Sequence, residues 1–353
     1  MLKFYDTIQP MYTADFDYKL PKELIAQTPV DPRDHSRLLT LDRHTGTITH
    51  VKKFFRITDY IHPGDVLVFN NTKVLPSRLL GKTIPDAKPI ELLLLRRLSP
   101  GIWHCIGKPG KRLISGSVLQ FGRGDSVMQA TVIKEHKEGF RTIRLEGEEE
   151  LARVGNIPVP PYIRDPLKDP TRYQTVFARI PGSAAAPTAG LHFTKQLIQK
   201  LCENSIELAF VTLHIGPGTF RPVSTEDPRN HFLDPEAFHV TNKAAATINR
   251  AKLEGRKVIC VGTTTMRVVE TIAAKQNSSP PLKAGDGWAD LLILPGHEFK
   301  VADGLITNFH LPRSSLLMLV SAFAGTQAVL GAYRTAIAEQ YRFASLGDGM
   351  LIK

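Results

Sequence analysis

Short apolar runs, separated by glycine and proline, set the middle of the chain apart from its two ends. Between residues 62 and 155, turns such as Pro63-Gly64-Asp65 and Pro109-Gly110 separate runs that favour extended structure. Short strands at this spacing predict a small, all-β barrel. The predicted strands are Val66–Phe69, Ile90–Leu95, Ile102–Ile106, Val118–Phe121, Val127–Ile133 and Phe140–Leu145.

From about residue 176 the pattern changes to strands that alternate with helices, which favours a mostly parallel sheet. The predicted strands are Ile206–Leu213, Lys257–Val261 and Asp290–Leu294. The predicted helices are Lys195–Cys202, Asn242–Leu253, Met266–Lys275, Ser314–Phe323 and Ala328–Tyr341. We therefore predict an α/β main domain with a mostly parallel sheet, residues 1–61 and 156–353, interrupted by an inserted small β-barrel domain, residues 62–155.

The loop Pro181–Gly190 carries almost no side chain larger than a hydroxyl and leads into a helix that Thr194 is expected to cap. Small residues allow a ligand to approach the backbone closely, and a helix N-terminus attracts anions. The alternative is a loop whose residues are small only because it is tightly packed. The candidate ligand contacts in and beside this loop are Tyr173, Gln174, Arg179, Ser183, Thr188 and His192.

Three further polar loops follow predicted strands or begin helices: Thr212–Val223, Gly262–Arg267 and Asp303–Ser315. In a parallel sheet such loops gather at the carboxyl ends of the strands, where ligands bind. Three consecutive threonines at a helix start suit an anion or a hydroxyl group, although one of them could serve only as a cap. The candidate residues are His214, Thr219, Thr263, Thr264, Thr265, Arg267, Asn308 and His310.

The net charge of +11 favours a polyanionic partner, with nucleic acid ahead of a membrane surface, although basic composition can also serve solubility alone. Candidate contacts lie in a Pro-rich turn, after a strand and on the predicted barrel. Each could instead be surface charge, a turn cap or a hairpin tip. They are Arg33, Arg37, Asn70, Asn71, Arg78, Arg96, Arg97, Lys108, Lys111 and Arg112.

The three cysteines are far apart, which suits a reducing cytosol and gives no metal pattern. Three histidines, His192, His214 and His310, could in principle hold a metal. They lack the short ligand spacing of known sites, so we predict no metal. Met1–Asp15 is polar and no run reaches membrane-spanning length, so we expect a cytoplasmic protein without a membrane partner.

Four motifs together resemble the S-adenosylmethionine:tRNA ribosyltransferase-isomerases of queuosine biosynthesis. They are RYQTVFARIPGSAAAPTAGLHFT, TLHIGPGTFRPV, VGTTTMRVVE and DGLITNFHLPRSSLLMLVSAFAG. The resemblance extends over nearly the whole chain from Ala14, and it implies an α/β domain interrupted by a small β-barrel. The chain departs from the family pattern at His231–Asp234, where a second histidine is often found. It also departs at Ala344 and Leu346, where aromatics are common.

The resemblance implies that the ribosyl group of S-adenosylmethionine moves to 7-aminomethyl-7-deazaguanine at the tRNA wobble position and is isomerised, giving epoxyqueuosine-tRNA, adenine and methionine. S-adenosylmethionine is then consumed as the ribosyl donor rather than held as a cofactor, and we expect a monomer. A base must remove a proton beside the sulfonium, and an acid must assist adenine. His214 and His192 are the candidates, with Glu236 and Glu270 as alternative bases.

Two other classes remain open at this point. A non-catalytic RNA-binding protein would explain the charge but not four polar loops. A different S-adenosylmethionine-dependent enzyme, such as a tRNA methyltransferase, would need a Gly-rich turn after its first strand, and the sequence lacks that turn.

Overall fold

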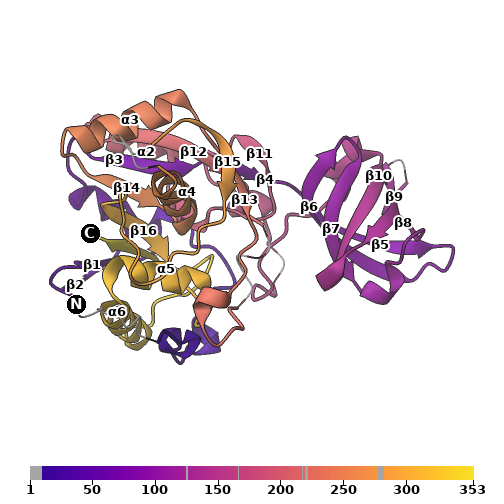
Figure 1. Cartoon of the computed structure of the whole chain (residues 1–353), viewed down its shortest axis with the longest axis horizontal. Helices are drawn as coiled ribbons and strands as arrows, with labels where there is room; N and C mark the ends of the chain where they lie inside the picture. Colours follow the sequence, from indigo (N-terminus) through magenta and orange to yellow (C-terminus); the bar gives the residue numbers. More distant parts are fainter. Residues whose placement is uncertain (1–9, 125, 166, 217, 219–221, 277–281) are drawn as a thin grey trace, which may run out of the picture.

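The protein consists of a large body and a small barrel that stand side by side, joined by two crossing segments (Figure 1). The structure is a computed structural model, and it describes residues 10–353 except 125, 166, 217, 219–221 and 277–281. The large body is built on one sheet, and the barrel is built from one continuous stretch of chain.

Within the described residues the main sheet has nine strands. In spatial order they are β15 (Gly285–Ala289), β13 (Glu236–Val240), β12 (Glu207–Leu213), β3 (Val66–Asn70), β14 (Val258–Val261), β16 (Gly304–Asn308), β17 (Gly349–Ile352), β1 (Leu38–Leu41) and β2 (Ile48–Val51).

This sheet is mixed, so the prediction of a mostly parallel sheet needs correction. The central strands β12, β3, β14 and β16 are parallel to one another. Antiparallel pairs lie on both sides of them: β13 with β12 and β15, β16 with β17, and β1 with β2. The β1–β2 pair is a hairpin closed by a turn in which Asp42 Oδ1 accepts from two backbone N–H groups.

The predicted strand Val66–Phe69 was assigned to the barrel, but it forms β3 at the centre of the main sheet. All five of its residues are buried, as expected for a strand covered on both faces. An apolar run alone cannot distinguish such a strand from one in a barrel wall. The strand predicted at Asp290–Leu294 is also wrong, because the strand there is β15, which ends at Ala289.

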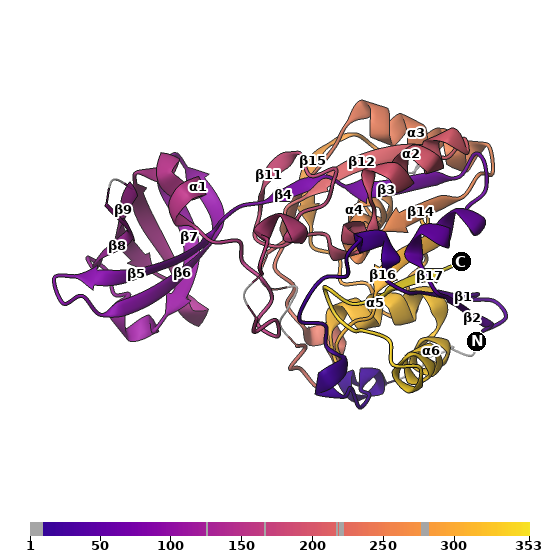
Figure 2. The same ribbon diagram turned by 180° about the vertical axis from the view of Figure 1, so that it is seen from behind.

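Helices cover both faces of the main sheet (Figures 1 and 2). They are α2 (Lys195–Glu203), α3 (Asn242–Leu253), α4 (Thr263–Ala274), α5 (Ser315–Ala324) and α6 (Thr326–Ala338). Helices α3 to α6 share one apolar core with Val68 and Cys260. The opposite core contains α2, the short helix η4 (Phe54–Asp59) and Phe69. Alternate residues of β3 therefore point into the two cores.

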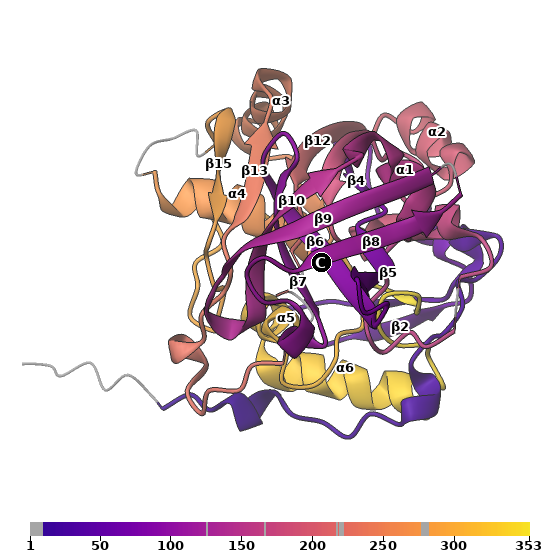
Figure 3. The same ribbon diagram turned by 90° about the vertical axis from the view of Figure 1, so that its right-hand side faces the viewer.

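The barrel is closed, with strand order β10-β7-β6-β5-β8-β9, and its side chains form a separate core around Trp103 and Phe121. Figure 3 views the molecule from the barrel side. The strands are β5 (Arg78–Ile84), β6 (Pro89–Ser99), β7 (Ile102–Lys108), β8 (Val118–Arg123), β9 (Ser126–Glu135) and β10 (Phe140–Glu146), and helix α1 (Leu151–Val154) follows.

The two segments that join the barrel to the main body run together. Strand β4 (Thr72–Val74) leads out and pairs in parallel with β11 (Ile180–Ser183), and Arg78 bridges to Asn156 on the return. The Arg96 guanidinium of the barrel also lies 5.5 Å from the Trp288 ring of β15.

Among the described residues, no single helix is long and apolar enough to cross a membrane. The pair α5 and α6 meets the length and composition criteria only when taken together, and the two helices are bent by 113° where they meet.

Candidate functional site

A cavity opens at the carboxyl ends of β14 and β16, and all four polar loops contribute to it. Its space is about 780 Å³, with the open solvent at its mouth included. The described lining residues are Tyr162, Ala186, Pro187, Thr188, Ala189, Ile215, Pro222, Gly262, Thr263, Thr264, Thr307, Asn308, Phe309, His310, Leu311, Pro312, Ser314, Leu316, Ala344 and Ser345. The predicted gathering of loops is present.

The start of α4 forms one wall of this cavity. Gly262, at the N-cap, has φ +96°, which is a conformation that favours glycine. The Thr265 hydroxyl donates to the Gly262 carbonyl over 2.7 Å, so this threonine serves the helix end. Thr263 and Thr264 line the cavity, where the first N–H groups of a helix carry a partial positive charge.

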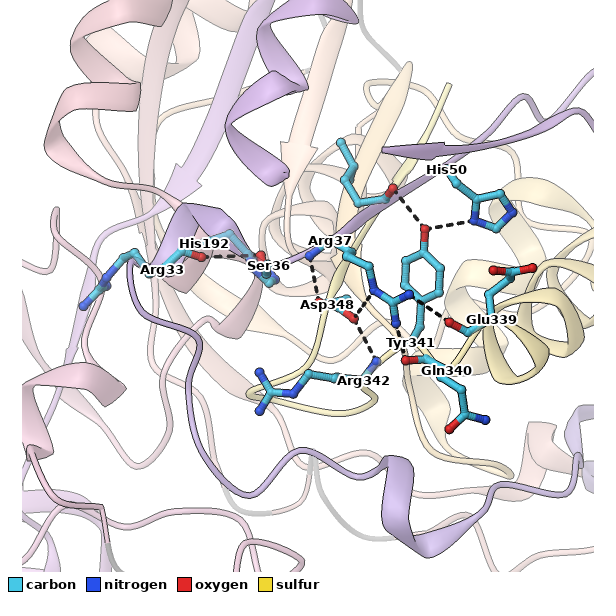
Figure 4. A network of polar contacts seen from close by, with 11 residues as sticks. Arg33, Ser36, Arg37, His50, His192, Glu339, Gln340, Tyr341, Arg342 and Asp348 are labelled. Atoms are coloured by element: carbon cyan, nitrogen blue, oxygen red, sulfur yellow. Dashed lines mark hydrogen bonds and ion pairs between the residues drawn. The ribbon is translucent and has the colours of Figure 1, made fainter. Parts of the chain in front are cut away.

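His192 is buried and holds a fixed place beneath the cavity rather than lining it. Its Nδ1 lies 2.7 Å from Ser36 Oγ and its Nε2 lies 3.2 Å from Asn308 Nδ2. Its ring stacks on Phe54 at 4.7 Å. Figure 4 shows His192 beside Ser36 and Arg33. Burial lowers the pKa of His192 to about 3, so the ring is neutral at physiological pH.

His214 is only half-buried and lies at the junction of β12 and the barrel connectors. Its Nδ1 is 2.8 Å from Thr72 Oγ1 on β4. A Cβ on Gly182 would stand 2.6 Å from the His214 ring, so the backbone there presses against the imidazole. Burial lowers the pKa of His214 below its ordinary value. The described residues that line the cavity include neither His214 nor His192.

His310 lines the cavity but is held by its own loop. Its Nε2 is 2.7 Å from Thr307 Oγ1, and its backbone N–H donates to the Tyr333 hydroxyl over 2.9 Å. Burial lowers the pKa of His310 to about 3, so this ring is also neutral.

The two candidate carboxylates are both engaged inside the protein. Glu236 forms a buried ion pair with Arg267, and it accepts from the Gly216 N–H over 2.8 Å. Glu270 accepts from the backbone N–H groups of residues 300, 301 and 302 at 2.9 to 3.0 Å. Neither carboxylate is therefore free to act as a base. The ion pair with Glu236 also engages the Arg267 guanidinium, which is then not free to bind a ligand.

The remaining candidates in and beside the loop Pro181–Gly190 mostly have structural roles. Gln174 bonds the backbone of Val74 with both amide atoms, and Tyr173 is fully buried. Ser183 donates to the Ala185 carbonyl and accepts from the Ile215 N–H. Arg179 is exposed, Thr188 lines the cavity, and Thr219 lies outside the described residues.

The candidate nucleic-acid contacts divide into two groups. Asn70 and Asn71 form hydrogen bonds with Leu213 and Thr212 of β12, and Arg37 packs on Tyr341 and pairs with Asp348. Arg33 is half-buried and donates to the Gln174 carbonyl. These four residues therefore hold the main body together.

The barrel residues are more accessible. Arg78 and Lys108 pair with Glu91 beside the groove between the two bodies. Arg97 pairs with Glu148. The exposed side chains in this group are those of Arg96, Arg97, Lys108 and Lys111, while Arg112 is partly buried and donates to the Pro89 carbonyl.

The described part of the chain contains no group of three or more His, Cys, Asp or Glu side chains placed to hold a metal ion. Several cavity residues were not predicted from the sequence, among them Tyr162, Phe309 and Ser345. The hydroxyl groups of Tyr162 and Ser345 lie 2.6 Å apart and form a hydrogen bond, although the two residues are 183 positions apart in the chain. A local sequence pattern cannot predict such a pair. Ala344, one of the departures from the resembled pattern, also faces the cavity.

Comparison with known proteins connects this geometry to a family. A model described as "Queuosine biosynthesis protein" matches residues 13–352. The chain is 50% identical over 347 residues to the S-adenosylmethionine:tRNA ribosyltransferase-isomerase of Moorella thermoacetica, covering 97% of this chain and 100% of the relative. The protein of the same name from Clostridioides difficile is 49% identical with the same coverage. A crystal structure titled S-adenosylmethionine tRNA ribosyltransferase, from Thermotoga maritima, is 36% identical with a TM-score of 0.54, covering 96% of this chain and 100% of that chain.

Proposed function

The chain belongs to the queuosine biosynthesis protein family, and on that premise we propose that it transfers the ribosyl group of S-adenosylmethionine to 7-aminomethyl-7-deazaguanine at the tRNA wobble position. The ribosyl group is isomerised, adenine and methionine leave, and the product is epoxyqueuosine-tRNA. The strongest support for this activity is sequence similarity over the full length. Relatives named for the activity match along their whole chains at 49–50% identity.

The cavity at the ends of β14 and β16 suits S-adenosylmethionine. The start of α4, with the hydroxyls of Thr263 and Thr264, offers donors for the methionine carboxylate. Phe309 and Leu311 add apolar surface for the adenosyl part. Arg267, also a candidate site residue, could have held the carboxylate by its charge, but its pairing with Glu236 leaves that role to the helix end.

His214 does not line the cavity, but the next residue, Ile215, does. His214 is therefore our candidate for the base that removes the C5′ proton, which the neighbouring sulfonium acidifies. Thr72 Oγ1 also lies within 3.5 Å of the Ile180 carbonyl and donates to it, so it accepts from His214 Nδ1–H. The Nε2 atom then carries the basic lone pair. Adenine takes up one proton as its glycosidic bond breaks, and the protonated His214 or water supplies that proton. Methionine leaves as a neutral thioether when the bond between its sulfur and C5′ breaks, and this step needs no nucleophile from the protein.

The barrel and its groove are our candidate for the tRNA contact, because exposed cations gather there next to the main body. We take the enzyme to act as a monomer in the cytoplasm, with no membrane partner and without a bound metal or cofactor. The free thiols of Cys105, Cys202 and Cys260 support a reducing compartment.

One incubation separates the possible activities. The purified protein, S-adenosylmethionine and substrate tRNA should yield free adenine and methionine in proportion to modified tRNA. S-adenosylhomocysteine in place of adenine would mean methyl transfer. Binding of tRNA without either product would leave an RNA-binding protein and refute the proposal.

Substitution of the two histidines tests their roles. His214→Ala should reduce turnover by roughly 10²- to 10⁴-fold, with S-adenosylmethionine affinity and melting temperature near wild type. His192→Ala should instead lower affinity and melting temperature together, because His192 is buried beneath the cavity. Near-normal turnover of His214→Ala would remove that residue from the mechanism.

A further inference from the structure

Two buried polar atoms face the cavity without a hydrogen-bond partner among the described residues. They are Oδ1 of Asn308 and Oγ1 of Thr264. The two residues are only 2% and 6% exposed. Leaving a buried polar atom unsatisfied is costly, so two of them at one cavity point to a ligand that supplies the partners.

These two atoms lie at the same edge of the sheet, because Asn308 ends β16 and Thr264 is in the first turn of α4, which follows the neighbouring strand β14. Val261 of β14 is paired with Ile306 of β16, and the Gly262 N–H donates to the Ile306 carbonyl over 2.7 Å. Asn308 lies two residues beyond this pair on β16. The same distance along the neighbouring strand β14 leads into the first turn of α4, so Asn308 and that turn lie opposite each other. Parallel strands lie about 4.8 Å apart, so an acceptor oxygen and a set of helix N-terminal donors are neighbours here.

A chain of hydrogen bonds beneath the cavity fixes the direction of the Asn308 amide. The Arg33 carbonyl can only accept, so the Ser36 hydroxyl donates to it. Ser36 Oγ then accepts from His192 Nδ1–H over 2.7 Å, which places the proton of the neutral ring on Nδ1. His192 Nε2 is therefore the acceptor, and the Asn308 amide turns its Nδ2 donor toward it across 3.2 Å. Figure 4 shows the buried part of this chain from Arg33 to His192.

The consequence is that the cavity receives the amide oxygen and not the amide nitrogen. A protonated imidazole would donate from both nitrogens, so the amide would have to turn and present its NH₂ group. Burial keeps His192 neutral, with a pKa lowered to about 3, and so maintains the orientation.

We propose that Asn308 Oδ1 accepts a hydrogen bond from the α-ammonium group of the methionine part of S-adenosylmethionine, while the Thr264 hydroxyl and the N-terminal N–H groups of α4 hold the adjacent α-carboxylate. His192 is a positioning residue that acts through Asn308. This inference rests on the proposed function, and it names how the same cavity recognises one end of the substrate.

The order of charges supports the ammonium over a ribose hydroxyl. One carbon atom separates the ammonium from the carboxylate in an amino acid, which matches an acceptor set beside helix donors. Hydrogen bonds to charged groups are also stronger than those between neutral groups. Asn308 is only 2% exposed, so its oxygen has little water to bind and gains most from a strong donor. The test must therefore distinguish a contact of Asn308 with the ammonium group from a contact with the ribose hydroxyls.

The test is a double-mutant cycle on dissociation constants, measured by isothermal titration calorimetry. Wild type and Asn308→Leu, a change of similar volume, are each titrated with S-adenosylmethionine and with its deamino analogue, which carries hydrogen in place of the ammonium. The quantity compared is the ratio of the two dissociation constants, that of the deamino analogue divided by that of S-adenosylmethionine. This ratio should be roughly 10 or more for the wild type and within about 3-fold of unity for Asn308→Leu.

Matched controls keep the result specific. Thr307→Val removes a cavity hydroxyl that already bonds His310, and it should keep the wild-type ratio. Asn308→Asp retains an acceptor, so it should keep or enlarge the ratio, and it serves if Asn308→Leu does not fold. Ser36→Ala should lower the ratio by loosening the histidine, and Ser36→Thr should restore it. A purely structural role of His192 would leave the ratio unchanged in both Ser36 variants.

Two results would overturn the inference alone, with adenine release by the wild type intact. One is an unchanged ratio in Asn308→Leu, and the other is coupling of Asn308 to 2′- or 3′-deoxyribose analogues instead of the deamino analogue. If the wild type neither binds S-adenosylmethionine nor releases adenine, both this inference and the proposed function fail.

Discussion

Acid should destabilise the main body through its two fully buried cavity-side histidines. Burial lowers the pKa values of His192 and His310 to about 3, while an unfolded histidine titrates near 6.5. Because the folded pKa is the lower one, the unfolded chain binds more protons between these values. Stability is therefore complete above about pH 6.5 and is lost progressively as the pH falls toward 3.

The size of the effect can be worked out at pH 5.5. There an unfolded histidine is mostly protonated and a folded one is not, which costs about 1.4 kcal/mol per residue relative to pH 7.5. The two histidines together should lower the free energy of unfolding by at least about 2.7 kcal/mol. The value depends little on the folded pKa, since that pKa lies well below 5.5.

Urea unfolding at the two pH values provides the assay. The chain has two tryptophans, Trp103 in the barrel and Trp288 on β15, so a Trp103→Phe background makes fluorescence report the main body. Between pH 7.5 and 5.5, His192→Asn should lose about 1.4 kcal/mol less stability than its parent. His44→Asn, at an exposed position, should lose as much as the parent. If His192→Asn retains the full loss, the buried neutral state of His192 is refuted.

Three further outcomes are expected. Binding of tRNA should weaken with salt by a slope of roughly −0.7 to −0.9 in log affinity per phosphate contact, and a flat response in filter binding would exclude the basic barrel face as the footprint. Turnover should survive dialysis against EDTA, since the described side chains offer no metal cluster; activity restored by one divalent ion, beyond any effect on tRNA folding, would contradict this. Glu236→Gln should cost about 3–5 kcal/mol of stability in urea by leaving Arg267 unpaired in the core, whereas a loss below about 1 kcal/mol would mean that the pair behaves like a surface one.

The convergence of the four loops could be predicted from the sequence because it follows from a local rule. A strand that ends in a polar, glycine-containing loop before a helix places that loop at the sheet edge, and Gly262 and Asn308 obey this rule. The identity of the sheet could not be predicted in the same way. The run Val66–Phe69 is equally apolar whether it lies in a barrel wall or at the centre of a larger sheet, and only its distant partners decide.

The roles of the titratable residues were hidden for a related reason. His192 is a catalytic candidate when only its loop is seen, but its partners Ser36 and Asn308 lie 156 and 116 residues away. Glu270 resembles a free carboxylate on a helix until the N–H groups of residues 300–302 are found around it. Burial and partners decide whether such groups are bases or supports, and both depend on tertiary structure.

The strand order of the main sheet has a consequence for how the chain is made. Strand β3 pairs with β12 and β14, which follow it by well over a hundred residues, and β1 pairs with β17, which follows it by about three hundred. The barrel, by contrast, is complete once residue 146 has been synthesised. During synthesis the barrel can therefore fold while β3 still lacks both of its partners and β1 is paired with β2 alone. Loss of residues 349–352 would remove β17 from between β16 and β1 and divide the sheet. These residues must thus be synthesised before the cavity that depends on this sheet can form.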